Sequence, residues 1–142
     1  MGRPATLSDS EFRALLDEVL TEANSDQRAG PVMRATGLRM RFEFPDIGLT
    51  LNVCASDDPG RHLDWAFGEH APREPRLELR MDSDVANGYL QGKESLAIAI
   101  ARGKVKVKGS SHVALLYLPA VRLLVEPYRK VITTEHPQLA LD

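Results

Sequence analysis

Residues 77–109 read LELRMDSDVANGYLQGKESLAIAIARGKVKVKG, and the spacing of hydrophobic residues changes repeatedly along this stretch. The first five residues alternate apolar with charged side chains, which predicts a half-buried strand. Asp82 is then a good N-cap for a short helix, which Gly92 ends. The alanines of residues 96–101 favour a second helix. Residues 103–109 alternate valine with lysine between two glycines, which predicts a further strand.

The chain upstream of this stretch is predicted to hold three more strands. Residues 38–44 and 49–54 alternate apolar with polar side chains across a turn that contains proline, aspartate and glycine, which is typical of a β-hairpin. Residues 63–68 alternate in the same way, and a proline-rich loop, 70–75, leads from them to the strand at 77–81. Strands linked this tightly, each with one polar face, are typical of an antiparallel meander.

Helices are predicted towards both ends of the chain. Ser8 with Glu11 forms a capping box, and the apolar stripe that follows predicts a helix ending near residues 22–24. The polar stretch 25–36 is broken by a Gly-Pro pair and is predicted to be a loop. From residue 110 to residue 128 the apolar spacing is helical again.

Proline punctuates the C-terminal region, where Pro119 is expected to kink or divide the helix. Residues 1–7 and 135–142 are expected to be loose. The sequence shows no internal repeat and no linker, so it predicts a single domain, residues 1–142. The expected fold class is α+β: a five-stranded antiparallel sheet with helices covering one face.

The composition indicates a soluble globular protein. The chain has 142 residues, 43% hydrophobic and 27% charged, and a formal net charge of −2, so no overall basic field indicates nucleic acid. Its one cysteine excludes an internal disulfide, and no apolar run reaches the ~18 residues of a membrane span. We therefore expect a cytoplasmic protein without a cofactor. Gly2 and Thr6 fit the loose myristoylation consensus, which is so short that we interpret the match as chance.

Signals for catalysis are sparse. The four histidines lie in predicted loops or at the ends of elements, without the i, i+4 spacing of a helical metal pair, and we expect them to be solvated. Residues 109–112 bring serine near histidine but lack the G-x-S-x-G pattern, so a turn and helix cap is the better interpretation. Cys54 is expected on the polar face of its strand beside Arg39 or Arg41, with a reactive thiol as the lesser alternative. The sequence therefore predicts no catalytic residue and no metal site.

The basic strand allows two interpretations. Its cations, with the arginine just before it, are Arg102, Lys104, Lys106 and Lys108. They form either a solvated sheet face with cross-strand ion pairs or a weak docking surface for anionic lipid headgroups. The solvated face is the simpler interpretation.

The helices of the second half carry more apolar surface than one sheet face needs. The surplus lies in residues 96–100 and 113–125. These segments either pack on one another as plain core, wall a cavity or form a dimer face. Composition alone favours the plain core.

Several motifs of the second half occur in an order that is known from one family. They are the strand with its acidic cap at 77–82, the helix closing on Gly92, the apolar run 97–101 and the Gly-Lys-Val-Lys-Val-Lys-Gly strand at 103–109, followed by a leucine-rich helix. This order resembles the sterol-carrier-protein (SCP2-like) family, and the resemblance covers about residues 37–125.

The resemblance implies a five-stranded sheet and helices that enclose an apolar tunnel for fatty acyl chains, sterols or acyl-CoA, without chemistry. Any dry cavity stabilises an alkyl chain by ~0.8 kcal/mol per buried CH₂, so such a tunnel needs few polar groups. Carried onto this sequence, the candidate wall residues are Phe42, Trp65, Leu79, Leu90, Leu96, Ile100, Val107, Leu116, Tyr117, Val121 and Leu124.

The leading hypothesis is a non-catalytic carrier whose partner is a lipid or another apolar small molecule. The alternative is a protein-interaction or homodimerisation module with a vestigial cavity. A third hypothesis is an enzyme acting on an apolar substrate, for which Ser111, His112 and Tyr117 are the best polar candidates.

Overall fold

The computed structural model describes residues 8–141. The expected loose lead-in at residues 1–7, the myristoylation pattern at Gly2 and the last residue lie outside the described residues. The helices are α1 (Asp9–Ser25), α2 (Ala29–Ala35), α3 (Ser83–Leu90), α4 (Leu96–Ala101), α5 (Ser111–Arg122), α6 (Val125–Glu135) and the short 3-10 helix η1 (Pro137–Leu139). The strands are β1 (Arg39–Phe44), β2 (Leu49–Ala55), β3 (Leu63–Phe67), β4 (Leu77–Met81) and β5 (Val105–Lys108).

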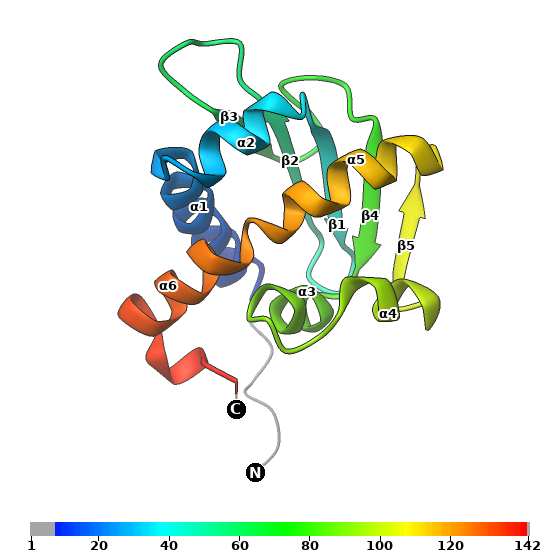
Figure 1. Ribbon diagram of the computed structural model, residues 1–142. Coiled ribbons are helices and arrows are strands. Elements are labelled where there is room, and N and C mark those ends of the chain that lie inside the picture. Colours follow the sequence, from blue (N-terminus) through cyan, green and yellow to red (C-terminus); the bar gives the residue numbers. More distant parts are fainter. Residues whose placement is uncertain (1–7, 142) are drawn as a thin grey trace.

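The five strands form one sheet in the order β3-β2-β1-β4-β5. Helix α5 crosses one face of this sheet, with α1 and α6 at one side and α3 and α4 along one end (Figure 1). The expected α+β class, with five strands and helices on one face, is confirmed. The expectation of a purely antiparallel sheet is wrong, because β1 and β4 pair in parallel from Met40 opposite Leu77 to Glu43 opposite Arg80.

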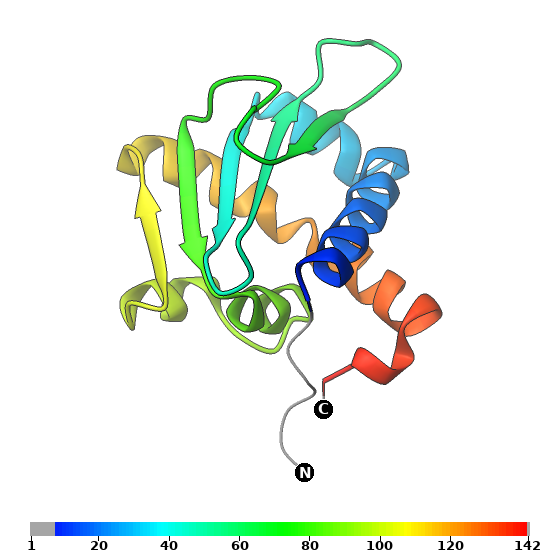
Figure 2. The same ribbon diagram turned by 180° about the vertical axis from the view of Figure 1, so that it is seen from behind.

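The parallel pair arises from a loop that crosses the open face of the sheet. Residues 68–76 leave β3 at one edge and reach β4 on the far side of β1 (Figure 2). The buried amide of Asn52 donates to the Gly68 carbonyl at 2.8 Å. Arg41 donates to the Glu69 carbonyl at 3.1 Å and to Asn52 Oδ1 at 2.9 Å. Polar side chains expected only to face solvent thus hold the crossover, which alternation of apolar residues does not reveal.

Residues 25–36 are not a loop throughout, since α2 occupies Ala29–Ala35. Pro31 lies in the first turn of α2, where no backbone N–H is needed for an intrahelical bond. Gly30 is required by close packing, because a Cβ at this position would lie 2.4 Å from Cδ2 of His62. The Gly-Pro pair that suggested a break therefore begins a short helix packed against β3.

The remaining helix predictions mostly hold. The Ser8–Glu11 capping box is present at the start of α1, and α3 ends just before Gly92, which has a φ of 77°. The residues from 96 to 101 are helical, as their alanines favoured. Helix α5 continues through Pro119 to Arg122, so the chain divides into two helices after this proline and not at it.

The C-terminal segment that was expected to be loose makes specific contacts. The side chain of Gln91 donates to the Leu139 carbonyl at 3.1 Å and accepts from the Leu141 backbone N–H at 2.8 Å. Gln91 is itself 5% exposed. These bonds tie the end of the described chain to the end of α3.

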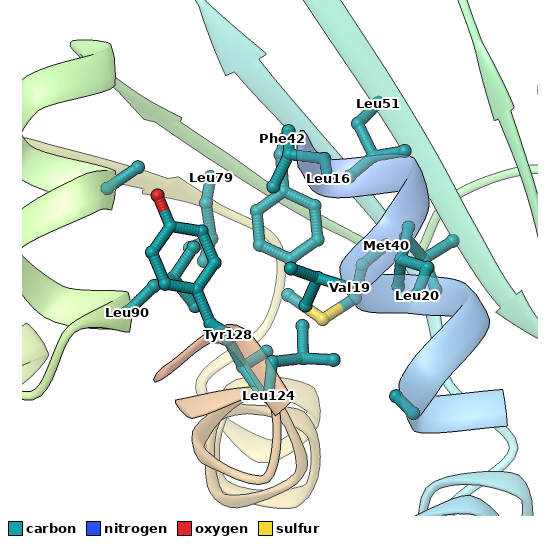
Figure 3. Packing of buried hydrophobic residues seen from close by; sticks show 14 of the residues in the cluster. Leu16, Val19, Leu20, Met40, Phe42, Leu51, Leu79, Leu90, Leu124 and Tyr128 are labelled. Atoms are coloured by element: carbon teal, nitrogen blue, oxygen red, sulfur yellow. The ribbon is translucent and has the colours of Figure 1, made fainter. Parts of the chain in front are cut away.

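The core lies between the helices and the covered face of the sheet. Figure 3 shows the ring of Phe42 with Leu16 of α1 on one side and Leu79 and Leu90 on the other. Tyr128 of α6 is fully buried, and its hydroxyl donates to Asn87 Oδ1 of α3 at 2.6 Å. One hydrophobic cluster thus joins every layer of the fold.

Candidate ligand-binding cavity

An apolar cavity lies inside this core, beside α3. Its volume is about 30 Å³. The lining comes from the covered face of the sheet, from α1, and from α3, α4 and the end of α5. The lining residues are Leu16, Phe42, Phe44, Leu51, Leu79, Met81, Ala86, Tyr89, Leu90, Leu96, Val121 and Leu124. Among these residues only Tyr89 carries a polar side-chain atom, so the cavity can hold hydrocarbon and offers almost nothing to a polar group.

The structure brings six of the eleven wall candidates together at this cavity. They are Phe42, Leu79, Leu90, Leu96, Val121 and Leu124. The sheet residues share one face by alternation, and the helix residues come from three separate segments that meet over the same end of the sheet. The remaining five candidates lie elsewhere.

Two of those five belong to strands at the edges of the sheet. Trp65 is on β3, where α1 covers it and its indole N–H donates to Asp17 Oδ1 at 2.8 Å. Val107 is on β5, at the opposite edge. The cavity lies over the central strands β1, β2 and β4, so residues of either edge strand lie outside it.

The other three candidates belong to α4 and α5. Ile100 faces an outer groove and not the cavity. Leu116 is 50% exposed, whereas Tyr117 is buried and its hydroxyl donates to the Gly37 carbonyl at 3.4 Å. The cavity meets α5 only from Val121 onward. Helical spacing identified the apolar residues of α5 but not which half of the helix borders the space.

Six lining residues were missed in the sequence. They are Leu16, Phe44, Leu51, Met81, Ala86 and Tyr89. Phe44 and Met81 lie two positions from predicted wall residues on the same strand face, so the alternation contained a signal for them. Leu16 belongs to the apolar stripe of α1, and that stripe shows burial without showing what it faces.

A larger groove lies outside the cavity, between the α3–α4 segment and the α5–α6 bend. Its volume is about 540 Å³. The lining residues are Tyr89, Gly92, Lys93, Glu94, Ser95, Leu96, Ala97, Ile100, Leu118, Pro119, Arg122 and Val125. Tyr89 and Leu96 line both spaces, so these two side chains form the partition between the cavity and the groove.

The groove contains charged groups next to this partition. Lys93 and Arg122 are its cations and Glu94 is its anion, and all three side chains are exposed. Burial raises the pKa of Tyr89, while the nearby positive charge of Arg122 acts to lower it. Within residues 8–141, neither cation makes a salt bridge.

The candidates for catalysis lie away from the cavity. Ser111 and His112 are exposed at the start of α5. Cys54 lies opposite Arg39 as expected, but it is 2% exposed, and burial raises the pKa of its thiol, which opposes thiolate formation. Among the described residues no group of three or more histidine, cysteine, aspartate or glutamate side chains could hold a metal ion.

The histidines are not all solvated, contrary to expectation. His62 is half-buried against α2, and its Nδ1 atom is buried without a hydrogen-bond partner within the described part of the chain. His136 is also half-buried and places Nε2 3.5 Å from Glu18 Oε2. His70 and His112 are exposed, as expected.

The basic strand carries part of the expected ion-pair network. The carboxylate of Glu78 in β4 lies 3.7 Å from Lys108 Nζ and 3.7 Å from Arg41 Nη1. Lys104 and Lys106 are exposed. Lysines along β5 also protect an edge strand from pairing with another chain. No helix in the described part of the chain is long and apolar enough to cross a membrane.

No protein-family model matches the chain, and no curated protein matches it in sequence. In three dimensions the chain is similar to a conserved hypothetical protein from Thermus thermophilus that is named as a candidate sterol carrier protein. That match has a TM-score of 0.62 and 18% identity over 92% of this chain and 95% of that one. A crystal structure of sterol carrier protein 2 matches with a TM-score of 0.57 and 17% identity, over 82% of this chain and 95% of that one.

A third similar structure is the stereoselective inverting sec-alkylsulfatase Pisa1 from Pseudomonas sp. It matches 65% of this chain with a TM-score of 0.52 and 15% identity, and this chain spans 14% of that enzyme's length. Together with the sheet order and the helices on one face, the full-length matches establish that the chain has a sterol-carrier-protein-2-like fold. The resemblance to this family, which covers about residues 37–125, is therefore confirmed for the fold.

Proposed function

We propose that this protein binds and carries a lipid or another apolar small molecule, without catalysis, in the cavity between the sheet and helices α3, α4 and α5. The observation that carries the proposal is the lining of the cavity, which is hydrocarbon and thioether apart from Tyr89. Such a lining stabilises an alkyl chain by ~0.8 kcal/mol per buried CH₂. The names of the similar structures support the same function.

The cavity must widen to accept such a ligand. Its 30 Å³ is enough for about one or two water molecules and far below the 300–1,000 Å³ of an ordinary ligand pocket. Helices α3 and α4 have eight and six residues, and short helices of this kind are held mainly by packing. We therefore expect these two helices to move outward when a chain enters.

A displacement assay with a fluorescent fatty acid tests the proposal. The purified protein is titrated with the probe and then with a panel of saturated acids, alcohols, sterols and acyl-CoA, and native mass spectrometry counts the bound molecules. Saturable binding of at least one lipid with a stoichiometry near one is the expected result. A panel that shows no saturable binding at solubility-limited concentrations would contradict the carrier function.

Self-association is the second candidate, and exposed apolar residues on α4 and α5 favour it. Leu115 is 77% exposed, Ile98 54% and Leu116 50%. Large exposed apolar side chains are typical of an interaction surface when they form one patch. Sedimentation velocity at low micromolar concentration separates the candidates, since a monomer with lipid bound supports the carrier alone, whereas a dimer that Leu115→Ser dissociates supports a contact surface here.

A further inference from the structure

The two residues of the partition, Tyr89 and Leu96, are held by apolar packing. The hydroxyl of Tyr89 makes no hydrogen bond within residues 8–141. Tyr128, by contrast, is tied to Asn87. Leu96 is the first residue of α4 and follows the turn and bend of residues 91–94. Both partition residues can therefore turn outward without breaking a polar contact.

The chemistry on the two sides of the partition is different. The cavity offers a polar head no partner except the Tyr89 hydroxyl, so a head drawn inside would lose its hydration without replacement. Lys93 and Arg122 line the groove outside together with the same tyrosine. Glu94 lies on the α3 side, where its carboxylate oxygen Oε2 would be 3.4 Å from a Cβ at Gly88. The groove is thus lined by two cations and one anion, and this excess of positive charge favours a negatively charged head.

We propose that the site takes a single-chain amphiphile with one anionic head, its tail in the cavity and its head against Lys93 and Arg122, and that Tyr89 and Leu96 are the gate between them. This inference rests on the proposed lipid-binding function and specifies its ligand class and entry route. A single alkyl chain suits a narrow cavity better than a fused ring system, because it needs the least widening. A carboxylate at the end of the chain supplies the charge.

Comparison of hexadecanoate with hexadecan-1-ol tests the head site, because the two ligands share their chain and differ in charge. The test variant is Lys93→Gln/Arg122→Gln. The control is Arg80→Gln/Lys106→Gln, which removes the same residue types from neighbouring strands of the sheet. We expect the test variant to weaken hexadecanoate by about tenfold, which two exposed charge pairs can supply together, and to leave hexadecan-1-ol unchanged.

The outcomes separate the two proposals. Binding of neither ligand to the wild-type protein overturns the carrier function itself. Equal binding of acid and alcohol, or an equal loss of both in the test variant, leaves the carrier function intact and overturns the anionic head site. The control variant should match the wild type for both ligands, and a loss there equal to that of the test variant also overturns the head site.

Stopped-flow binding of the fluorescent fatty acid tests the gate. Tyr89→Ala and Leu96→Ala each remove part of the partition, which lowers the barrier to passage of the ligand. Both the association and the dissociation rate should therefore rise by about tenfold or more. Tyr89→Phe keeps the ring of the partition and should therefore change both rates less than Tyr89→Ala does. Circular dichroism confirms that each variant is folded. Unchanged rates in both folded alanine variants would overturn the gate.

Discussion

Two regions of the core contain the same kinds of apolar residues, but one is filled and the other borders an empty space. The first, the α2 junction, comprises Leu20, Ala23, Met33 and Leu63 from α1, α2 and β3, and each of them is at most 1% exposed. The second is the cavity beside α3, where apolar side chains of the same kinds border empty space. The regions also differ in the polar contacts of particular side chains.

Hydrogen bonds draw the α2 junction together. Asn24 of α1 accepts from the backbone N–H groups of His62 and Leu63 at 2.8 and 3.0 Å. The Asp17–Trp65 bond joins α1 to β3 a few residues away. At the cavity, the side chain of Tyr89 has no such bond in the part of the chain that the structure describes. Helix α3 is bonded to the β1–β2 turn at its start, because the Asp46 carboxylate accepts from the backbone N–H and the hydroxyl of Ser83 at 2.9 and 2.6 Å. The cavity therefore differs from the α2 junction at Tyr89 and not along the whole of α3.

The largest test of this comparison is the same truncation in each region. Leu63→Ala should lower the free energy of unfolding by about 3–5 kcal/mol, because the side chain loses all its contacts in a filled site. Leu90→Ala should cost about 2–3 kcal/mol, since part of its surface already borders empty space. Urea denaturation followed by circular dichroism measures both values.

The unfolding slope against urea provides the check on this pair. It should be the same in both variants, which shows that the unfolded states expose similar surface. Equal losses of stability in the two variants would mean that the space at the cavity contributes nothing to the difference between the regions.

A smaller effect is expected from adding atoms instead of removing them. Ala23→Val and Ala86→Val place the same β-branched side chain in a helix, one at the α2 junction and one at the cavity. Overpacking should cost Ala23→Val about 1–3 kcal/mol, whereas Ala86→Val should cost less than about 1 kcal/mol because the void accepts the new methyl groups. Thermal unfolding measures both.

Ligand affinity should change in Ala86→Val and not in Ala23→Val, whereas the larger loss of stability is expected in Ala23→Val. Ala86→Val occupies part of the cavity and should weaken fatty acid binding, while a folded Ala23→Val should bind as the wild type does. If the Ala86→Val protein binds fatty acid with normal affinity, the void is not the binding site.

The sequence predicted the elements better than their arrangement. Alternation in residues 38–54 and 77–81 identified β1, β2 and β4, and the capping box placed the start of α1. The parallel β1–β4 pair was missed because it depends on Arg41 and Asn52 holding a crossover loop. Such polar contacts join residues distant in the chain and leave no periodic signal.

The candidate site shows the same division. Apolar spacing found Phe42, Leu79 and Leu90 because burial on one face follows from the period. It could not separate Val121 from Tyr117, which occupy the same helix, since both are buried and only tertiary packing decides which one borders the void. Tyr89 was missed as a lining residue because the apolar spacing of α3 does not show what each side chain faces.

The smallest expected effects come from removing one tyrosine hydroxyl at a time. One of these hydroxyls makes a hydrogen bond, and the other makes none among the described residues. Tyr128→Phe removes the hydroxyl that donates to Asn87 and should lower the free energy of unfolding by about 1–2 kcal/mol, the usual effect of losing a buried hydrogen bond. Burial raises the pKa of Tyr128, which favours the neutral hydroxyl that donates this bond. Tyr89→Phe removes a hydroxyl that has no partner among the described residues and should change stability by less than about 0.5 kcal/mol. Urea denaturation of both variants measures the difference. If Tyr89→Phe loses as much stability as Tyr128→Phe, the Tyr89 hydroxyl makes a stabilising contact and the partition is restrained.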